Sequence, residues 1–367
     1  MRKLFRLLFS KIGILQWGQK LYLSFLELKQ KFAIYFFLPF FSKTGFLSSF
    51  YYTFFSSAFN QSHQSILKGK IKHLRNLYSK KENEYLLANY IHAIEKGLTM
   101  KDRKEIFALS YIKKTVKAYE SVIKGESIIS EERIKWFFDI LNMYFQEAGE
   151  HMVIKEAKNH FYSLPKYHGS VEECFVPFKR IDVVKSNIHF DDFLKLTRQR
   201  RSVRWFQNKK VPHELIDKAI SASILSPSAC NRQPFRFLIY DDKEWLSKLA
   251  SLPSGTKGFS DNIPMLVLVV GMTDAYENER DKNVFYIDAS LASMSFMLAL
   301  ETLGLSSCAL NWPDVKQKEK ELRSVLDIEI TDRVVMFIAV GYPEANDYIG
   351  SSAKKSVEKI RAYNSKK

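Results

Sequence analysis

Two uninterrupted apolar runs constrain the fold of this 367-residue chain more than any other feature. Residues 265–271 read MLVLVVG, and residues 334–340 read VVMFIAV before a Gly-Tyr-Pro turn. Short apolar runs rich in β-branched residues are typical of strands that are buried on both faces of a sheet. Such a sheet needs apolar helices to cover it. The two runs therefore predict the centre of a sheet in the second half of the chain.

The segments around these runs alternate between strand and helix patterns. Apolar residues at helical spacing predict a helix over 213–225, and a long apolar helix is expected over 283–304. Further strands are expected over 235–240 and 307–311, and further helices over 243–252 and 315–326. The expected fold class is α+β, with a central sheet flanked by helices. The sequence has no G-x-G-x-x-G or Walker loop, so it lacks the phosphate-binding device of Rossmann and P-loop proteins.

Four arginines crowd around one serine shortly before the helix predicted over 213–225. They are Arg198, Arg200, Arg201 and Arg204, and the serine is Ser202. Planar guanidinium groups give bidentate, charge-assisted hydrogen bonds to phosphate oxygens, and a hydroxyl adds a further donor. The cluster is therefore a candidate phosphate site. A solvated basic turn is the alternative interpretation of these residues alone.

A second polar segment follows the same predicted helix and leads into the strand at 235–240. Residues 227–234 read PSACNRQP. The R-R-S-x-R and P-S-x-x-N-x-Q-P segments, in this order and one helix apart, resemble the nitroreductase family of FMN-dependent oxidoreductases. The resemblance covers residues 191–367 and leaves the first half of the chain unexplained.

The resemblance implies a cofactor and the residues that hold it. The FMN phosphate would be bound by Arg200, Arg201, Ser202 and Arg204. The flavin ring and ribityl chain would be lined by Pro227, Ser228, Ala229, Asn231 and Gln233. NADH or NADPH would reduce the flavin and leave the site. A small-molecule electron acceptor would then bind where the nicotinamide had been, in a ping-pong order. The resemblance also implies a homodimer with FMN at the interface, the two segments of each site coming from different subunits.

Two further positions are implied less directly. The family has a basic residue near its C-terminus that reaches the phosphate; Lys354 is the best match and Lys355 the fallback, although Ser356 stands where the family has proline. A tail of surface lysines is the alternative. The family also has a glycine turn whose N–H faces flavin N5. This chain has none there, so a backbone N–H of Leu310 or Asn311 is expected to serve.

The sequence offers no side-chain nucleophile, catalytic triad or metal-ligand motif, and no metal is expected. Its three cysteines, Cys174, Cys230 and Cys308, are far apart and form no C-x-x-C pair, which favours a reducing cytoplasm. Cys230 lies in the ring-lining segment, but without a resolving partner a structural role is the expected one. Trp312 is expected to fill core instead of capping the flavin.

The first half of the chain is basic, aromatic and then helical. The expected domains are a basic aromatic segment (1–68), a helical region (69–160), a linker (161–190) and the flavin domain (191–367). The first 31 residues hold seven Lys or Arg and one Glu, and the whole chain carries a formal charge of +16. Residues 1–68 are interpreted as contacting an anionic membrane surface from the cytoplasmic side. Packing against the chain or a dimer partner is the alternative, and nucleic acid is disfavoured because no recognition motif is present.

Within the helical region, helices are expected over 85–94, 107–119 and 133–148, with Gly97 as a C-terminal stop. His92 and Glu95 lie at i and i+3, and a local ion pair at a helix end is favoured over a metal or acid–base site. The H-x-x-E-K-G-L segment that contains them resembles a nitroreductase subgroup linked with surface-polysaccharide genes.

The expected function is an NAD(P)H-dependent FMN oxidoreductase that reduces nitroaromatic, quinone or enone-like acceptors. Two alternatives remain open at this point. One is a membrane-peripheral accessory protein with the same fold and no turnover. The other is a flavin-dependent dehydrogenase on the same scaffold.

Overall fold

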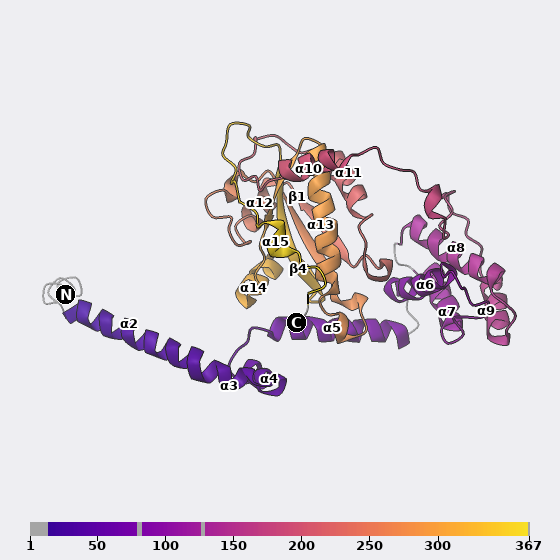
Figure 1. Cartoon of the computed structure of the whole chain (residues 1–367), viewed down its shortest axis with the longest axis horizontal. Coiled ribbons are helices and arrows are strands. Elements are labelled where there is room, and N and C mark those ends of the chain that lie inside the picture. The colour runs from indigo at the N-terminus through magenta and orange to yellow at the C-terminus, as the bar shows by residue number, and fades with distance from the viewer. Residues whose placement is uncertain (1–13, 79–82, 126–128, 366–367) are drawn as a thin grey trace. The chain divides into compact units, whose positions relative to one another are not determined.

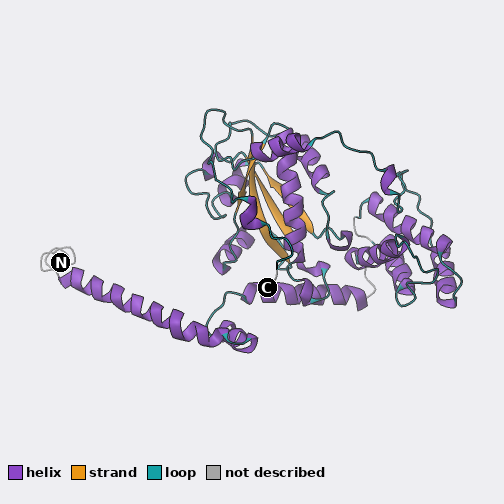
Figure 2. Ribbon diagram, viewed as in Figure 1, coloured by secondary structure: helices purple, strands orange, loops and turns teal. Residues whose placement is uncertain are grey.

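The computed structural model describes residues 14–78, 83–125 and 129–365. The chain divides into two compact units, Met1–His63 and Gln64–Lys367. The larger unit contains a four-stranded sheet and, earlier in the chain, a group of helices with its own core. Figure 2 distinguishes the strands of the sheet from the helices.

The sheet consists of β1 (Phe235–Tyr240), β2 (Met265–Met272), β3 (Ser306–Leu310) and β4 (Asp332–Gly341). Its order is β1-β2-β4-β3, and all neighbouring strands are antiparallel. The two apolar runs of the sequence are the central strands β2 and β4, as predicted. Every residue of β2 is buried, because helices cover both faces of the sheet.

Alternate residues of the central strands face two different helical layers. Met265, Val267 and Val269 pack with α11 (His213–Ser223) and α13 (Val284–Thr302). The intervening residues of β2 pack with α12 (Lys243–Leu249) and α14 (Lys316–Val325) on the other face. This alternation follows from the two-residue period of a strand. Figure 1 shows α13 running along the sheet. The α+β class predicted from the sequence is confirmed.

The helical region consists of α6 (Glu84–Leu98), α7 (Ile112–Lys124), α8 (Glu131–Glu147) and α9 (Met152–Ser163). These four helices pack around a separate apolar core. The helices predicted over 85–94 and 133–148 are confirmed. The one predicted over 107–119 begins only at Ile112.

The interpretation of Gly97 as a helix stop is wrong, because α6 continues to Leu98. A Cβ atom at Gly97 would lie 2.4 Å from the Cε2 atom of Phe107. Gly97 thus permits the Phe107 ring to pack closely against α6.

Helix α5 (Asn60–Tyr78) packs against the turn after β2 through residues beyond 64. Gly69 permits this approach, since a Cβ atom there would lie 2.7 Å from the carbonyl carbon of Thr273. Lys72 forms ion pairs with Asp274 at 2.9 Å and Glu329 at 2.7 Å. From residue 64 onward, α5 therefore belongs with the sheet-containing unit.

In the smaller unit, helix runs without interruption from α2 (Ile14–Phe32) through a π-helical turn (Ala33–Phe37) into α3 (Leu38–Ser42). The turn precedes Pro39, whose missing N–H leaves the carbonyl of residue 35 without its usual helical partner. Helix α4 (Gly45–Phe54) follows and is capped by the side chain of Thr44. Many aromatic side chains of this unit are exposed.

One helix of the described chain, Glu279–Thr302, has the length and apolar composition of a membrane span. It contains α13, which covers one face of the sheet. A core helix passes the same test, so this observation is weak evidence for a membrane span.

Candidate functional site

The arginine segment, residues 200–206, extends the edge of the sheet beside β3. Ser202 pairs in parallel with Ser307, and the N–H of Val203 donates to the Ser307 carbonyl at 3.1 Å. At the far end, the N–H of Phe206 donates to Oδ1 of Asn262 at 2.6 Å, and Nδ2 of Asn262 donates to the Phe206 carbonyl at 3.0 Å. Val203 and Phe206 are buried, which leaves Ser202 and Arg204 exposed on the alternate positions.

The arginine segment lacks carboxylate ion-pair partners within the described part of the chain. Among the described residues, Arg200, Arg201 and Arg204 form no ion pair with a carboxylate. The Nε atom of Arg200 is buried and has no hydrogen-bond partner. Arg204 lies over the ring of Phe259 at 5.9 Å. A buried charged donor without a partner is costly, so this arrangement fits an anion bound at the segment.

Glu301 is the nearby carboxyl group whose charge acts on Arg200. Burial raises the pKa of Glu301. The hydrogen bond from Gln199 and the positive charge of Arg200 lower it by less. Nε2 of Gln199 donates to Oε2 of Glu301 at 3.2 Å. Glu301 forms no ion pair with Arg200 among the described residues, which leaves Arg200 available to a ligand.

The segment that carries Lys354 is tied to the arginine segment. Arg201 donates a hydrogen bond to the carbonyl of Ser351. Lys354 is exposed three residues farther along the chain. The structure thus brings this stretch beside Arg201, whereas in the sequence 150 residues separate Arg201 from Ser351.

The 227–234 segment has an unusual backbone. Cys230, Asn231 and Gln233 have φ angles of 54°, 49° and 51°. Residues with a side chain rarely adopt this left-handed conformation and do so at an energetic cost. Ser228, Ala229, Asn231 and Gln233 are half-buried, Pro227 is exposed and Pro234 is buried.

Hydrogen bonds hold this backbone in place. The N–H of Gln233 donates to Oγ of Ser228 at 3.1 Å, and Nε2 of Gln233 donates to Oδ1 of Asn231 at 3.0 Å. The N–H of Ala229 donates to Oδ2 of Asp288 at 3.1 Å. Strained backbone that is restrained from several sides is typical of ligand sites.

Asp288 was missed by the sequence reasoning. It lies on α13 and is only 3% exposed. It also accepts a hydrogen bond from the hydroxyl of Tyr276 at 3.3 Å, while Arg232 stacks on the Tyr276 ring at 5.1 Å. Burial raises the pKa of Asp288, opposed by these hydrogen bonds. The available signal was that Asp288 is one of only two charged residues, with Glu301, in a long apolar helix.

The two segments lie at opposite ends of α13. Asp288, near its start, holds Ala229, whereas Glu301, near its end, contacts Gln199 beside the arginine segment. At 1.5 Å per residue these two positions on the helix are about 20 Å apart. In one chain the two segments are therefore two separate candidate half-sites.

The outer face of α13 carries an apolar stripe. Ile287, Leu291 and Met294 are 57%, 43% and 39% exposed and lie at i, i+4 and i+7. Oγ of Ser226 lies 2.8 Å from Oγ of Ser295, which places the exposed Leu225 beside the stripe. Contiguous exposed apolar residues of this kind mark an interaction surface.

The other residues singled out in the sequence are Leu310, Asn311, Trp312 and the three cysteines. Leu310 ends β3 and is buried, and the carbonyl of Asn311 accepts from the N–H of Ser254 at 2.9 Å. Trp312 is buried in the core as expected, with Nε1 donating to Glu319 at 2.9 Å. All three cysteines are free thiols.

His92 and Glu95 form a weak local pair. Nδ1 of His92 lies 3.9 Å from Glu95, which also accepts from Nε1 of Trp136 at 3.3 Å. Within the part of the chain that the structure describes, no group of His, Cys, Asp and Glu could hold a metal ion.

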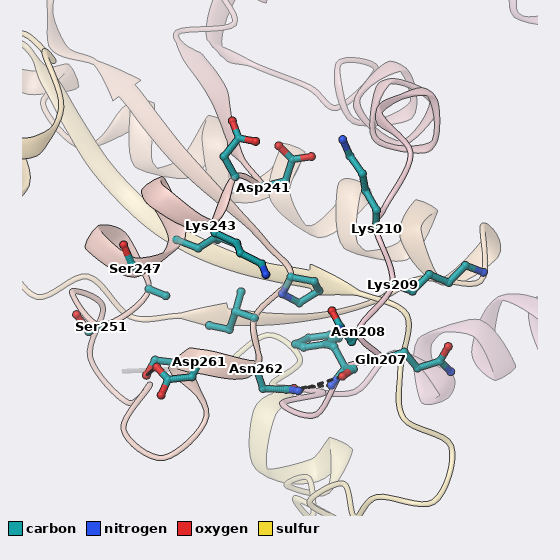
Figure 3. A pocket seen from close by; sticks show the side chains of 17 residues that line it. Gln207, Asn208, Lys209, Lys210, Asp241, Lys243, Ser247, Ser251, Asp261 and Asn262 are labelled. Atoms are coloured by element: carbon teal, nitrogen blue, oxygen red, sulfur yellow. Dashed lines mark hydrogen bonds between the residues drawn. The ribbon is translucent and has the colours of Figure 1, made fainter.

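A pocket of about 800 Å³ lies beyond the end of the arginine segment (Figure 3). Its wall carries Lys209, Lys210 and Lys243 together with Asp241 and Asp261. It includes none of residues 200–204 and none of residues 227–234. Phe206, the last residue of the arginine segment, lines this pocket, whereas the arginines of that segment do not.

Residues 197–256 and 246–342 match the model of the nitroreductase family. The chain is 30% identical over 173 residues to a putative NADH dehydrogenase/NAD(P)H nitroreductase of Methanothermobacter thermautotrophicus, a match that covers 44% of this chain and 86% of the relative. Pig iodotyrosine deiodinase 1 is 25% identical over 197 residues, covering 46% of this chain and 67% of that protein. A solved putative nitroreductase in complex with FMN, from Desulfovibrio desulfuricans, aligns with 47% of this chain and 97% of its own at 25% identity and a TM-score of 0.41.

Proposed function

The chain belongs to the nitroreductase family, and we propose from this premise that it is an FMN-dependent oxidoreductase that uses NADH or NADPH. The observation that carries the proposal is the arginine segment. Its three guanidinium groups have no carboxylate partner among the described residues, and one buried N–H of Arg200 has no hydrogen-bond partner. A phosphate group would supply both the charge and the acceptors.

Each residue of this segment makes a different contact with that phosphate. Arg200 and Arg204 neutralise its charge, and the exposed hydroxyl of Ser202 donates a hydrogen bond. Arg201 adds a contact and, through Ser351, holds the stretch from which Lys354 approaches. Pairing with the β3 edge fixes the backbone that carries these side chains, so that backbone needs no further ordering when the phosphate binds.

Residues 227–234 line the ring and ribityl chain in this proposal. Asn231 and Gln233 each offer a donor and an acceptor. Pro227, Ser228 and Ala229 form the surrounding wall, and a backbone N–H of Leu310 or Asn311 faces the ring. FMN, when bound, supplies two-electron transfer between the nicotinamide and the acceptor, which occupy the site in turn.

A second copy of the chain completes each site. The half-sites of one chain lie about 20 Å apart along α13, so one FMN takes the arginine segment from one subunit and residues 227–234 from the other. A twofold axis produces two such sites through one self-complementary interface. The apolar stripe of Ile287, Leu291 and Met294 suits the centre of this interface.

The proposed acceptors are nitroaromatic, quinone or enone-like compounds that stack on a planar ring. A sugar or lipid-linked compound of surface-polysaccharide synthesis is the cellular context that we propose. The iodotyrosine deiodinase relatives add halogenated aromatics to the compounds worth testing.

Residues 1–68 are proposed to bind an anionic membrane surface from the cytoplasmic side. Tyr35, Phe36 and Phe46 are exposed, and lysines on the same unit are exposed as well. Aromatic rings at headgroup depth and cations near anionic lipid give this kind of peripheral binding.

Purification and anaerobic titration test the enzymatic proposal. The protein is expected to be yellow, with about one FMN per chain, and its flavin absorbance should bleach when NADH or NADPH is added. Acceptors are then added one class at a time, and recovery of the oxidised spectrum identifies those that react. A colourless protein that rejects added FMN would support the accessory-protein alternative. A flavin reduced by a candidate substrate but not by a nicotinamide would support the dehydrogenase.

A further inference from the structure

The helical region makes a direct polar contact with residues 227–234. Arg133, in the first turn of α8, donates a hydrogen bond from Nη1 to the carbonyl of Asn231 at 3.1 Å. The contact joins residues 98 positions apart in the sequence. It lies between the helical core and the sheet-containing domain, which otherwise have separate apolar cores.

The guanidinium of Arg133 is held from its own side of the contact. It lies over the rings of Trp136 at 5.7 Å and Phe137 at 5.5 Å, and it forms an ion pair with Glu84 of α6. Its side chain is only 16% exposed. A charged donor fixed in this way makes a stronger and more directional hydrogen bond than a mobile surface arginine.

The acceptor of this hydrogen bond is a strained peptide. Asn231 has a φ of 49°, and its neighbours Cys230 and Gln233 are also left-handed. Oδ1 of Asn231 accepts from Nε2 of Gln233, which couples the two side chains. The bond from Arg133 to the Asn231 carbonyl restrains the backbone from which these side chains project.

Helix α6 also contributes residues to the surroundings of the 227–234 segment. Tyr85 packs against the cluster of Tyr276 and Phe285, beside Asp288. A pocket of about 320 Å³ is lined by Asn89 of α6 together with Ala229, Cys230 and Arg232. The helical region thus forms part of the wall around residues 227–234.

We propose that Arg133 is a positioning residue for the flavin site, and that through it the helical region forms part of the redox centre. The proposal rests on the function proposed above. It gives residues 84–164 a defined role: they keep a strained, ring-lining backbone in the conformation that binding and electron transfer require.

Arg133→Ala in the full-length holoenzyme tests this role. We expect FMN to bind roughly ten- to hundredfold more weakly, the loss typical of a missing hydrogen bond from a charged donor. At saturating FMN, kcat should fall by up to roughly a hundredfold, since small displacements of a site cost that much. The visible spectrum of the bound flavin should also shift. Each measurement is made well below the thermal unfolding midpoint of the variant.

Four further variants separate positioning from stability. Ile140→Val weakens the same helical core without touching residues 227–234, and Arg103→Ala removes the exposed ion pair with Glu147; both should keep wild-type flavin affinity, spectrum and kcat. Arg133→Lys retains the charge but not the planar group, so partial rescue is expected. If Arg133→Ala does not fold, Glu84→Gln removes the charge partner of Arg133 and should show smaller losses in the same direction.

The outcomes distinguish this inference from the function on which it rests. If a folded Arg133→Ala variant keeps the wild-type spectrum, FMN affinity and kcat, the positioning role is wrong and the oxidoreductase proposal stands. The role is also wrong if Ile140→Val produces the same losses at equal destabilisation. If the wild-type protein itself binds no FMN, the proposed function fails first.

Discussion

Asp288 accepts a hydrogen bond from the backbone N–H of Ala229 at 3.1 Å, which joins the start of α13 to the left-handed 227–234 segment. The same oxygen accepts from the hydroxyl of Tyr276. Asp288→Ala would leave both donors without this partner in a buried place. We expect the free energy of unfolding to fall by about 1–3 kcal/mol, together with weaker FMN binding.

Urea unfolding and fluorescence titration with FMN measure these two effects. Asp288→Asn is the matched control, because it keeps an oxygen acceptor of the same size and should retain most of the stability. Equal behaviour of the alanine and asparagine variants would contradict a role for the hydrogen bonds.

The raised pKa of Asp288 predicts a pH dependence with a definite sign. A carboxyl group whose folded-state pKa is raised contributes stability at low pH that is lost as the pH rises through that pKa. Asp288→Asn has no such loss. The stability of the variant relative to wild type should therefore increase as the pH rises from below about 3.9, the usual aspartate value, through the folded-state pKa. Urea unfolding of both proteins across this pH range measures the difference in stability. A difference that stays constant with pH would contradict the prediction.

Arg200→Ala combined with Arg204→Ala should give a folded protein without flavin. Both side chains lack carboxylate partners within the described chain, so their removal costs the fold little while removing the two guanidinium groups proposed to neutralise the phosphate. Circular dichroism and the flavin-to-protein absorbance ratio measure the two results. Lys209→Ala with Lys210→Ala removes the same charge a few residues away and should keep FMN. Stoichiometric FMN in the arginine variant would refute the phosphate assignment.

Leu291→Arg should separate the proposed dimer into monomers and release FMN at the same time. A charge at the centre of an apolar stripe would have to be buried without a partner, and each site needs both subunits. Sedimentation and FMN stoichiometry are measured on the same samples. Ile181→Arg introduces the same charge at an exposed apolar residue outside the stripe and should change neither quantity. A monomeric variant that keeps its FMN would show that one chain suffices.

Phe36→Ser combined with Phe46→Ser should weaken binding to anionic vesicles by about tenfold or more, because two rings no longer enter the headgroup region. Cosedimentation with phosphatidylglycerol vesicles measures the loss. Added salt should also weaken the binding of the wild-type protein to these vesicles, because it screens the charges. Phe178→Ser, an exposed ring outside the smaller unit, is the control. Equal binding of wild type to neutral phosphatidylcholine vesicles would argue against an anionic surface.

The amino-acid sequence alone determined the elements that depend on local pattern. The strands at 265–271 and 334–340 follow from uninterrupted apolar runs, and the helix at 213–225 follows from its apolar spacing. The two polar segments on either side of that helix identified the family. These features could be predicted because a strand, a helix or a binding segment of this kind depends on residues that are close in the chain.

Only the tertiary structure decided how these elements meet. It placed the arginine segment and residues 227–234 at opposite ends of α13, and it brought Asp288 and Arg133 to the same strained loop. The Arg133–Asn231 and Arg201–Ser351 contacts span 98 and 150 residues. No local pattern encodes such pairs, because packing of the whole chain determines which distant side chains come within hydrogen-bonding distance.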